Sequence, residues 1–354
     1  MSSNRAKLSA PPASVPECLC AVDGVAALIG GTPLLEIHYR VDGQPRRIYA
    51  KYESMNMTGS VKDRMALHVL RRAYESGALR PGDQIVEASS GNTGISFAAI
   101  GRALGHRVRI YMPDWMSAER GQLMHNFGAE VVPVSKAQGG FVGSVRLARE
   151  FAEENERVFL PSQFDNESNI EAHELGTGPE IVEQLAQLGQ TPDVFVAGVG
   201  TGGTVMGVGR CLRRSEKPWA KGVRIHPLEP ANSPTMRTGH RTGQHRIQGI
   251  SDEFIPSIVH FDELDEVVDV WDGDGILMAQ MLCYALGLAV GISSGANVIG
   301  AMQRLEERGG EGTVVTVLPD SNKKYLSTAL CNAEPPRDEY LSPRVRLDRF
   351  VAVR

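Results

Sequence analysis

Short apolar runs alternate with longer amphipathic segments along most of the chain. Within 61–75, for example, Met65, Val69 and Leu70 recur at helical spacing, whereas 194–197 is a continuous apolar run of strand length. The predicted strands are 47–53, 84–86, 108–112, 131–134, 158–160, 194–197 and 223–228. The predicted helices are 61–75, 95–104, 117–127, 142–155, 180–188 and 205–214. Strands that alternate with helices in this way predict an α/β protein with parallel sheets, whose active crevice lies at the carboxyl ends of strands.

One long segment, 275–303, contains no charged residue. A membrane-spanning helix needs roughly 20 mostly apolar residues, so the segment has the length of a span. It is interrupted by Gln280, by the pair Ser293 and Ser294, and by Asn297. We therefore interpret it as a buried interior segment.

The composition narrows the class of protein. Of the 354 residues, 42% are hydrophobic and 22% are charged, which is typical of a soluble globular protein. The net charge of −5 gives no basic excess, so neither nucleic acid nor a membrane is expected as a partner. The five cysteines show no disulfide or metal-site spacing, and we interpret Cys18 and Cys20 as reduced thiols in a loose segment. The N-terminus lacks the apolar core of a signal peptide, so we expect the cytoplasm.

A glycine-rich loop, 199–204 (VGTGGT), follows the apolar run 194–197 and precedes a predicted helix. Its glycines lack Cβ atoms, so successive backbone N–H groups can converge on an anion, and the helix dipole adds positive potential. Its threonines add hydroxyl donors. We expect a single phosphate group here, with these candidate ligands: Gly200, Thr201, Gly202, Gly203 and Thr204.

The same stretch matches the dinucleotide fingerprint Gly-x-Gly-x-x-Gly at Gly198, Gly200 and Gly203. Glu229 ends the next strand, as the ribose partner would. This pattern alone does not choose between a dinucleotide and another phosphate ligand.

A second loop, 87–94 (EASSGNTG), also lies at a predicted junction of strand and helix. The hydroxyls of Ser89, Ser90 and Thr93 and the amide of Asn92 suit a carboxylate at a helix N-terminus. Simple capping of the helix by serine or asparagine is the alternative.

Lys62 falls in the first turn of the predicted helix 61–75. An ammonium group is electrostatically disfavoured there, which eases its deprotonation and suits a lysine that forms an imine. From charge alone, an ordinary solvated lysine is the simpler interpretation.

Together these motifs resemble the pyridoxal-phosphate enzymes of the cysteine synthase family, which have the tryptophan synthase β-like fold. The resemblance runs from 29–34 (IGGTPL) through 177–181 (TGPEI) and 291–296 (GISSGA) to 325–330 (YLSTAL). It therefore covers nearly the whole chain.

The resemblance implies an α/β fold of two three-layer lobes with mostly parallel sheets. We expect a flexible extension over 1–23, one catalytic unit over 24–330 and a tail over 331–354. The smaller lobe is expected at about 56–165, and the larger lobe comprises the rest of the catalytic unit, 24–55 and 166–330.

The resemblance also assigns roles to the candidate residues. It implies that Lys62 forms the internal aldimine with pyridoxal 5′-phosphate and later removes the substrate Cα proton. Asn92 would bond the ring hydroxyl, the 200–204 loop would hold the phosphate, and Ser293 rather than Ser294 would contact the pyridine nitrogen. The implied substrate-binding residues are Ser89, Ser90, Thr93, Gln163 and Gly249.

A serine at the pyridine nitrogen leaves that nitrogen neutral, whereas a carboxylate would keep it protonated and make the ring a deep electron sink. Loss of a β substituent is then favoured over transamination or racemisation. The resemblance therefore implies β-replacement on O-acetylserine or O-phosphoserine through an aminoacrylate. Sulfide or another thiol-type nucleophile would give L-cysteine or an S-substituted cysteine.

The sequence departs from common cysteine synthases in a few places. Ser89 stands where threonine is usual, and Asp252 and Glu253 follow 248–250 (QGI) where smaller neutral residues are expected. These differences leave the donor and the nucleophile open, and cystathionine β-synthase-like condensation and serine or threonine deamination stay as alternatives. The resemblance suggests a homodimer, and the sequence does not decide whether a serine acetyltransferase binds it.

Overall fold

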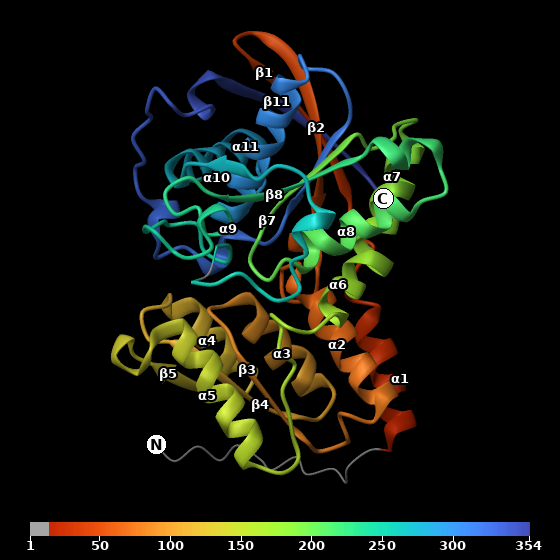
Figure 1. Cartoon of the computed structure of the whole chain (residues 1–354), viewed down its shortest axis with the longest axis vertical. Coiled ribbons are helices and arrows are strands. Elements are labelled where there is room, and N and C mark those ends of the chain that lie inside the picture. Colours follow the sequence, from red (N-terminus) through yellow and green to blue (C-terminus); the bar gives the residue numbers. More distant parts are fainter. Residues whose placement is uncertain (1–13, 252) are drawn as a thin grey trace.

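The computed structural model describes residues 14–251 and 253–354, and their strands form two sheets in separate lobes (Figure 1). The larger sheet has the order β11-β1-β2-β10-β7-β8-β9 and the smaller one β5-β4-β3-β6. The strands of the larger sheet are β1 (Leu34–Val41), β2 (Gln44–Tyr52), β7 (Val194–Gly198), β8 (Arg224–Pro230), β9 (Val268–Val270), β10 (Val314–Leu318) and β11 (Val345–Val353). Those of the smaller sheet are β3 (Gln84–Ala88), β4 (Arg107–Pro113), β5 (Glu130–Val134) and β6 (Val158–Phe159).

Helices cover both sheets, as the alternation of patterns predicts. The helices packed with the smaller sheet are α1 (Val15–Ala26), α2 (Lys62–Ser76), α3 (Asn92–Ala103), α4 (Ala118–Asn126) and α5 (Gly140–Glu154). Those of the larger lobe are α6 (Ser168–Ala172), α7 (Gly178–Gln187), α8 (Gly203–Arg214), α9 (Thr235–Thr238), α10 (Asp272–Leu286) and α11 (Ile292–Glu307), with a π-helix, His173–Thr177, between α6 and α7. Short 3-10 helices occur at 53–55, 136–138, 218–222, 261–263, 322–324, 329–331 and 342–344.

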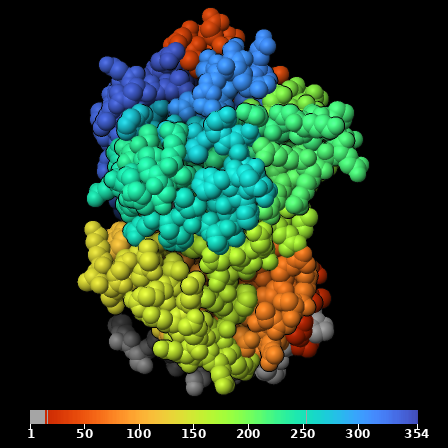
Figure 2. All heavy atoms as spheres, in the orientation of Figure 1, coloured from red at the N-terminus to blue at the C-terminus, as the bar shows by residue number. Residues whose placement is uncertain are grey.

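The smaller sheet is parallel throughout, and β2, β10, β7, β8 and β9 are parallel in the larger sheet. The mixed α/β fold with mostly parallel sheets is therefore confirmed. We propose the division into lobes near residues 56 and 165, because the four strands of the smaller sheet all lie between these positions. In the space-filling view the smaller lobe lies beneath the larger one (Figure 2).

Within the extension predicted over 1–23, the structure describes a helix. A helix, α1, begins at Val15, where Ser14 and Glu17 form a capping box. Cys18, Val22 and Val25 recur at helical spacing and pack into the core of the smaller lobe. The first thirteen residues lie outside the described part, and Cys18 and Cys20 are both free thiols.

The residues 331–354, predicted as a tail, end in a strand of the larger sheet. Strand β11 pairs with β1 in antiparallel register from Leu34 opposite Val353 to Val41 opposite Val345. Val345 and Leu347 are buried against the core of the larger lobe, which stabilises this edge.

The charge-free segment 275–303 forms most of two consecutive helices, α10 and α11. Gly287, with φ 69°, ends α10 in the left-handed conformation. Nearly all of α11 up to Met302 is buried, as predicted for an interior segment. Among the described residues, no helix has both the length and the apolar character needed to cross a membrane.

Candidate active site

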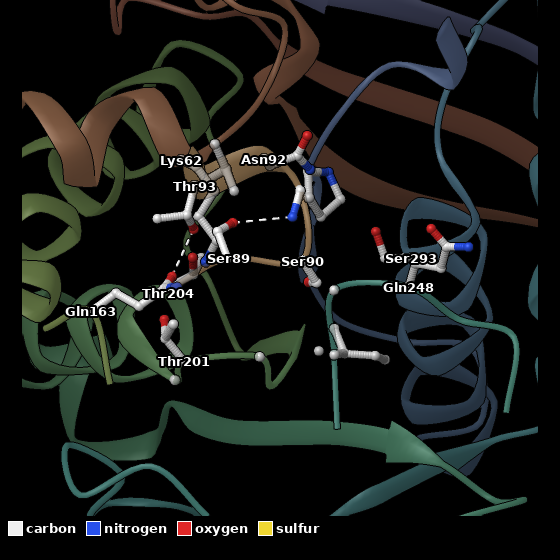
Figure 3. Close-up of a pocket in the computed structure, with 18 of the residues that line it drawn as sticks. Lys62, Ser89, Ser90, Asn92, Thr93, Gln163, Thr201, Thr204, Gln248 and Ser293 are labelled. Carbon is white, nitrogen blue, oxygen red and sulfur yellow. Dashed lines mark hydrogen bonds between the residues drawn. The ribbon is translucent and has the colours of Figure 1, made fainter. Parts of the chain in front are cut away.

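One cavity between the lobes brings together all the predicted site residues except Gly203 (Figure 3). The smaller lobe contributes the start of α2, the turn between β3 and α3, and Gln163. The larger lobe contributes the turn between β7 and α8, the loop 248–250 and the start of α11. The predicted residues that line it are Lys62, Ser89, Ser90, Asn92, Thr93, Gln163, Gly200, Thr201, Gly202, Thr204, Gly249 and Ser293.

Lys62 is the first residue of α2 and reaches the cavity from the helix N-terminus. The next residue, Asp63, is buried and accepts hydrogen bonds of 2.6 Å from the backbone N–H and the hydroxyl of Thr58 and from the Ser96 hydroxyl. These bonds tie the loop before α2 to α3. They fix the helix end that carries Lys62.

A buried cluster of charged side chains also holds α2 in place. Arg64 contacts Glu53 at 2.6 Å and Glu180 at 2.7 Å, and Lys51 contacts Glu180 at 2.7 Å. Although burial opposes it, the Arg64 guanidinium lowers the pKa of Glu180 to about 2. The two carboxylates balance the two cations, so the cluster joins β2, α2 and α7 without an uncompensated charge.

The 199–204 loop has the backbone geometry of an anion cradle. Gly202 precedes α8 with φ 90°, and a Cβ on Gly200 would lie 2.3 Å from the Gly249 carbonyl oxygen. Both positions therefore require glycine. In the described part of the chain no carboxylate lines this cavity, which fits a phosphate group at the α8 N-terminus.

Two residues without an assigned role hold the hydroxyls of this loop. Asn169 donates to Thr201 Oγ1 at 2.9 Å, and His173 Nε2 lies 3.3 Å from Thr204 Oγ1. Burial lowers the pKa of His173 to about 3, so its imidazole is neutral at neutral pH. The loop is thus supported by uncharged partners. Gly203 packs against Asn169 instead of facing the cavity.

The turn before α3 uses its hydroxyls in two different ways. The Ser89 hydroxyl accepts hydrogen bonds from the N–H groups of Gly91 at 3.0 Å and Gly94 at 2.9 Å, so it satisfies a free N–H group in the first turn of α3 although Gly91 is the N-cap residue. Thr93 donates to Gln163 at 2.6 Å, and Gln163 donates to the Ala88 carbonyl at 2.8 Å. The hydroxyl of Ser89 is therefore used to hold the start of α3, and substrate binding by the turn stays a prediction.

The two serines at the start of α11 differ in position. Ser293 lines the cavity, whereas Ser294 is fully buried and does not line it. Across the cavity, Asn92 Oδ1 is buried and has no hydrogen-bond partner among the described residues. An unsatisfied acceptor on a residue that lines a cavity fits a bound ligand with a donor group. These positions agree with the expected contacts to a pyridoxal ring.

The structure adds three residues that sequence spacing did not single out: Arg120, Asp320 and Tyr325. Arg120 and Tyr325 line the cavity, and Asp320 is buried behind Asn92. Tyr325 lies in the family motif 325–330, which is the one signal that points to it. Asp252 lies outside the described residues, and Glu253 pairs with Arg241 at 3.3 Å.

Comparisons with known proteins agree with this site. The model of the family "Pyridoxal-phosphate dependent enzyme" matches residues 25–320. Cysteine synthase from Staphylococcus aureus is 41% identical over 309 residues, which are 87% of this chain and 97% of that protein. A hydrogen sulfide-producing enzyme from Fusobacterium nucleatum has 51% identity and a TM-score of 0.90, covering 93% of this chain and 97% of its own. Cysteine synthase from Entamoeba histolytica has 33% identity and a TM-score of 0.80, covering 97% of each chain.

Proposed function

Because the chain belongs to the family of pyridoxal-phosphate dependent enzymes, we propose that it catalyses β-replacement on an activated L-serine. The Cβ–O bond to acetate or phosphate breaks, and the oxygen keeps the electron pair. A Cβ–S bond forms with sulfide or another thiolate, giving L-cysteine or an S-substituted cysteine. The proton taken from Cα is returned to it, so the amino acid keeps its oxidation state.

Pyridoxal phosphate supplies an aldehyde that binds amines and a ring that accepts negative charge from Cα. We propose that Lys62 Nζ holds the cofactor and carries the Cα proton. The N–H groups and hydroxyls of the 200–204 loop hold the phosphate, Asn92 contacts the ring oxygen and Ser293 the pyridine nitrogen. Ser90, Thr93 and Gln163 bind the substrate carboxylate at the N-terminus of α3.

The observation that carries this proposal is Ser293 in a cavity lined by no described carboxylate. A hydroxyl at the pyridine nitrogen leaves the ring a weaker electron sink than an aspartate would. With the cofactor bound, this would favour loss of the β substituent over transamination.

The test is a matrix of donors and nucleophiles. Purified holoenzyme is incubated with O-acetyl-L-serine or O-phospho-L-serine and with sulfide, and the amino-acid product is identified by mass spectrometry. We expect a visible cofactor band and a cysteine product, both lost in Lys62→Ala and kept in Lys323→Ala, which alters an exposed lysine. Protein that binds no pyridoxal phosphate would overturn the proposal.

A second candidate function comes from the 51% identity to the hydrogen sulfide-producing enzyme. With L-cysteine as donor, the Cβ–S bond would break, hydrosulfide would leave and another nucleophile would bond to Cβ. The rate of sulfide release from L-cysteine is compared with the rate of cysteine formation from O-acetyl-L-serine. The faster reaction shows whether the enzyme mainly consumes or mainly makes cysteine.

We propose further that the enzyme acts in the cytoplasm as a homodimer. All five cysteines are free, which suits a reducing compartment. The homodimer is proposed from the family resemblance. Light scattering after size-exclusion chromatography tests it. A mass of about 38.4 kDa instead of twice that value would reject the dimer.

A further inference from the structure

A second cavity adjoins the one that contains Lys62, and we call the two the outer and the inner cavity. The outer cavity is lined by residues of both lobes, among them Trp115, Ser117, Arg241, His245 and Thr328. Trp115 and Arg241 are exposed, so this cavity lies on the solvent side. The residues that line both cavities form the neck between them: Ser90, Arg120, Phe141, Gln248, Gly249 and Ile250.

Arg120 is the charged residue of this neck. Arg120 is only 3% exposed, and its Nη1 donates a hydrogen bond to the Ser90 carbonyl at 3.0 Å. The guanidinium carbon lies 4.9 Å from the centre of the Tyr325 ring. Nε is buried and has no hydrogen-bond partner among the described residues. A buried guanidinium with an unused donor is costly unless a ligand supplies an acceptor.

The other arginines of the outer cavity are already paired. Arg241 contacts Glu253 at 3.3 Å, and Arg246 contacts Asp272 at 2.9 Å and Glu334 at 2.5 Å. In the described ranges, Arg120 instead contacts the Ser90 carbonyl, the Met116 sulfur, and both the ring and the hydroxyl of Tyr325. The neck therefore keeps a positive charge that no described carboxylate offsets within ion-pairing distance.

We propose that Arg120 forms an anion subsite for the part of a reactant that projects outward from the inner cavity. This inference rests on the proposed β-replacement. The α-carboxylate of the donor is expected at the N-terminus of α3, and Arg120 lines the neck through which a β substituent would project towards the outer cavity. The ligand is a carboxylate carried by the incoming thiol or the oxyanion of the leaving group. Gln248 also lines the neck, and its amide N–H groups can donate to such an anion.

The first experiment compares two thiols of equal length, 3-mercaptopropionate and 3-mercapto-1-propanol, with O-acetyl-L-serine as donor. We expect the holoenzyme to favour the acid, and Arg120→Met to lower the ratio of their kcat/KM values by about tenfold or more. Arg120→Lys keeps a charge and should lose less. Arg102→Met, which removes an exposed charge at the end of α3, should leave the ratio unchanged.

The second arm varies the donor at a constant neutral thiol. If the leaving group is the ligand, Arg120→Met lowers kcat/KM for O-phospho-L-serine more than for O-acetyl-L-serine, and the ratio for the two thiols stays constant. Equal losses with every donor and thiol would overturn the subsite, because Arg120 would then only support the Ser90 turn.

A direct measurement separates this inference from the proposed function. Sodium sulfate is titrated into holoenzyme in a calorimeter, without turnover. We expect saturable binding that Arg120→Met abolishes and Arg102→Met keeps. Such binding in a protein that forms no product would reject β-replacement and keep the anion subsite, whereas sulfate binding unaffected by Arg120→Met would reject the subsite.

Discussion

Asn92 Nδ2 donates a hydrogen bond of 2.7 Å to the carboxylate of Asp320, a residue buried at the end of the larger sheet. The Tyr325 hydroxyl donates to the same carboxylate oxygen. A carboxylate accepts hydrogen bonds, so it selects the NH2 end of the Asn92 amide. The Oδ1 end is thereby fixed in place, without a described partner.

Replacing Asp320 by asparagine should therefore disturb the residue proposed to contact the cofactor ring. A lost charge-assisted bond costs about 1.5–3 kcal/mol, so we expect kcat/KM to fall about 10- to 100-fold. The visible absorption band of the holoenzyme should also shift, because the partner of the ring oxygen moves. Tyr325→Phe keeps the carboxylate and should cause a smaller change. An unaltered band and kcat/KM in Asp320→Asn would contradict this role.

Gly200 should tolerate no side chain. A Cβ there would lie 2.3 Å from the Gly249 carbonyl oxygen, so Gly200→Ala must displace the loop backbone. We expect at least a tenfold loss of pyridoxal phosphate affinity, measured by fluorescence titration of the apoenzyme. Gly24→Ala is the matched control, because Gly24 is exposed in α1 with no atom near the added methyl group. It should bind cofactor normally and stabilise the fold by about 0.5–1 kcal/mol. Equal affinities would contradict the cradle.

The buried cluster behind Lys62 should contribute to stability through Arg64. Arg64→Met leaves the fully buried Glu53 without its guanidinium partner and should lower the free energy of unfolding by about 3–5 kcal/mol. Arg71→Met, on the exposed side of α2, breaks only a surface pair with Asp23 and should cost less than about 1 kcal/mol. Urea unfolding of the two variants measures the difference. Similar losses would mean that the cluster contributes no more than a surface pair.

The alternation of helices and strands was predictable because each element buries one face or a whole run of apolar residues. All the predicted strands and helices appear, with bounds that shift by a few residues. Four strands of the larger sheet, β1, β9, β10 and β11, were not predicted. Pairing of β1 with β11 joins residues about 300 positions apart, and local periodicity contains no information about that partner.

The residues of the candidate site also fall into two groups: those that local sequence patterns reveal and those that only the folded structure reveals. Lys62 and the two glycine loops are local patterns at the ends of strands or the starts of helices, and they can be recognised from neighbouring residues. Asp320 contacts Asn92 across 228 positions, and Arg120 reaches the Ser90 carbonyl from the first turn of α4. The first contact depends on how the two lobes pack, and the second on how α4 packs beside the turn before α3, so the sequence alone could not predict them.

Glu87 should make the stability of the fold depend on pH. Its carboxyl is buried at the end of β3, and burial raises its pKa to about 7 despite hydrogen bonds from the N–H groups of Ala88 at 2.8 Å and Gln163 at 3.2 Å. Between pH about 4.5 and 7 the folded chain binds a proton that the unfolded chain releases. Stability must therefore fall as the pH rises through this window.

The loss attributable to Glu87 should reach about 3 kcal/mol, since each unit of pKa shift corresponds to about 1.4 kcal/mol. Glu87→Gln cannot ionise, so its stability relative to the parent protein should rise from pH 5 to pH 8. Urea midpoints at several pH values measure this difference, which removes the contribution of all other titrating groups. A difference that does not change with pH would show that Glu87 ionises as readily in the fold as in the unfolded chain.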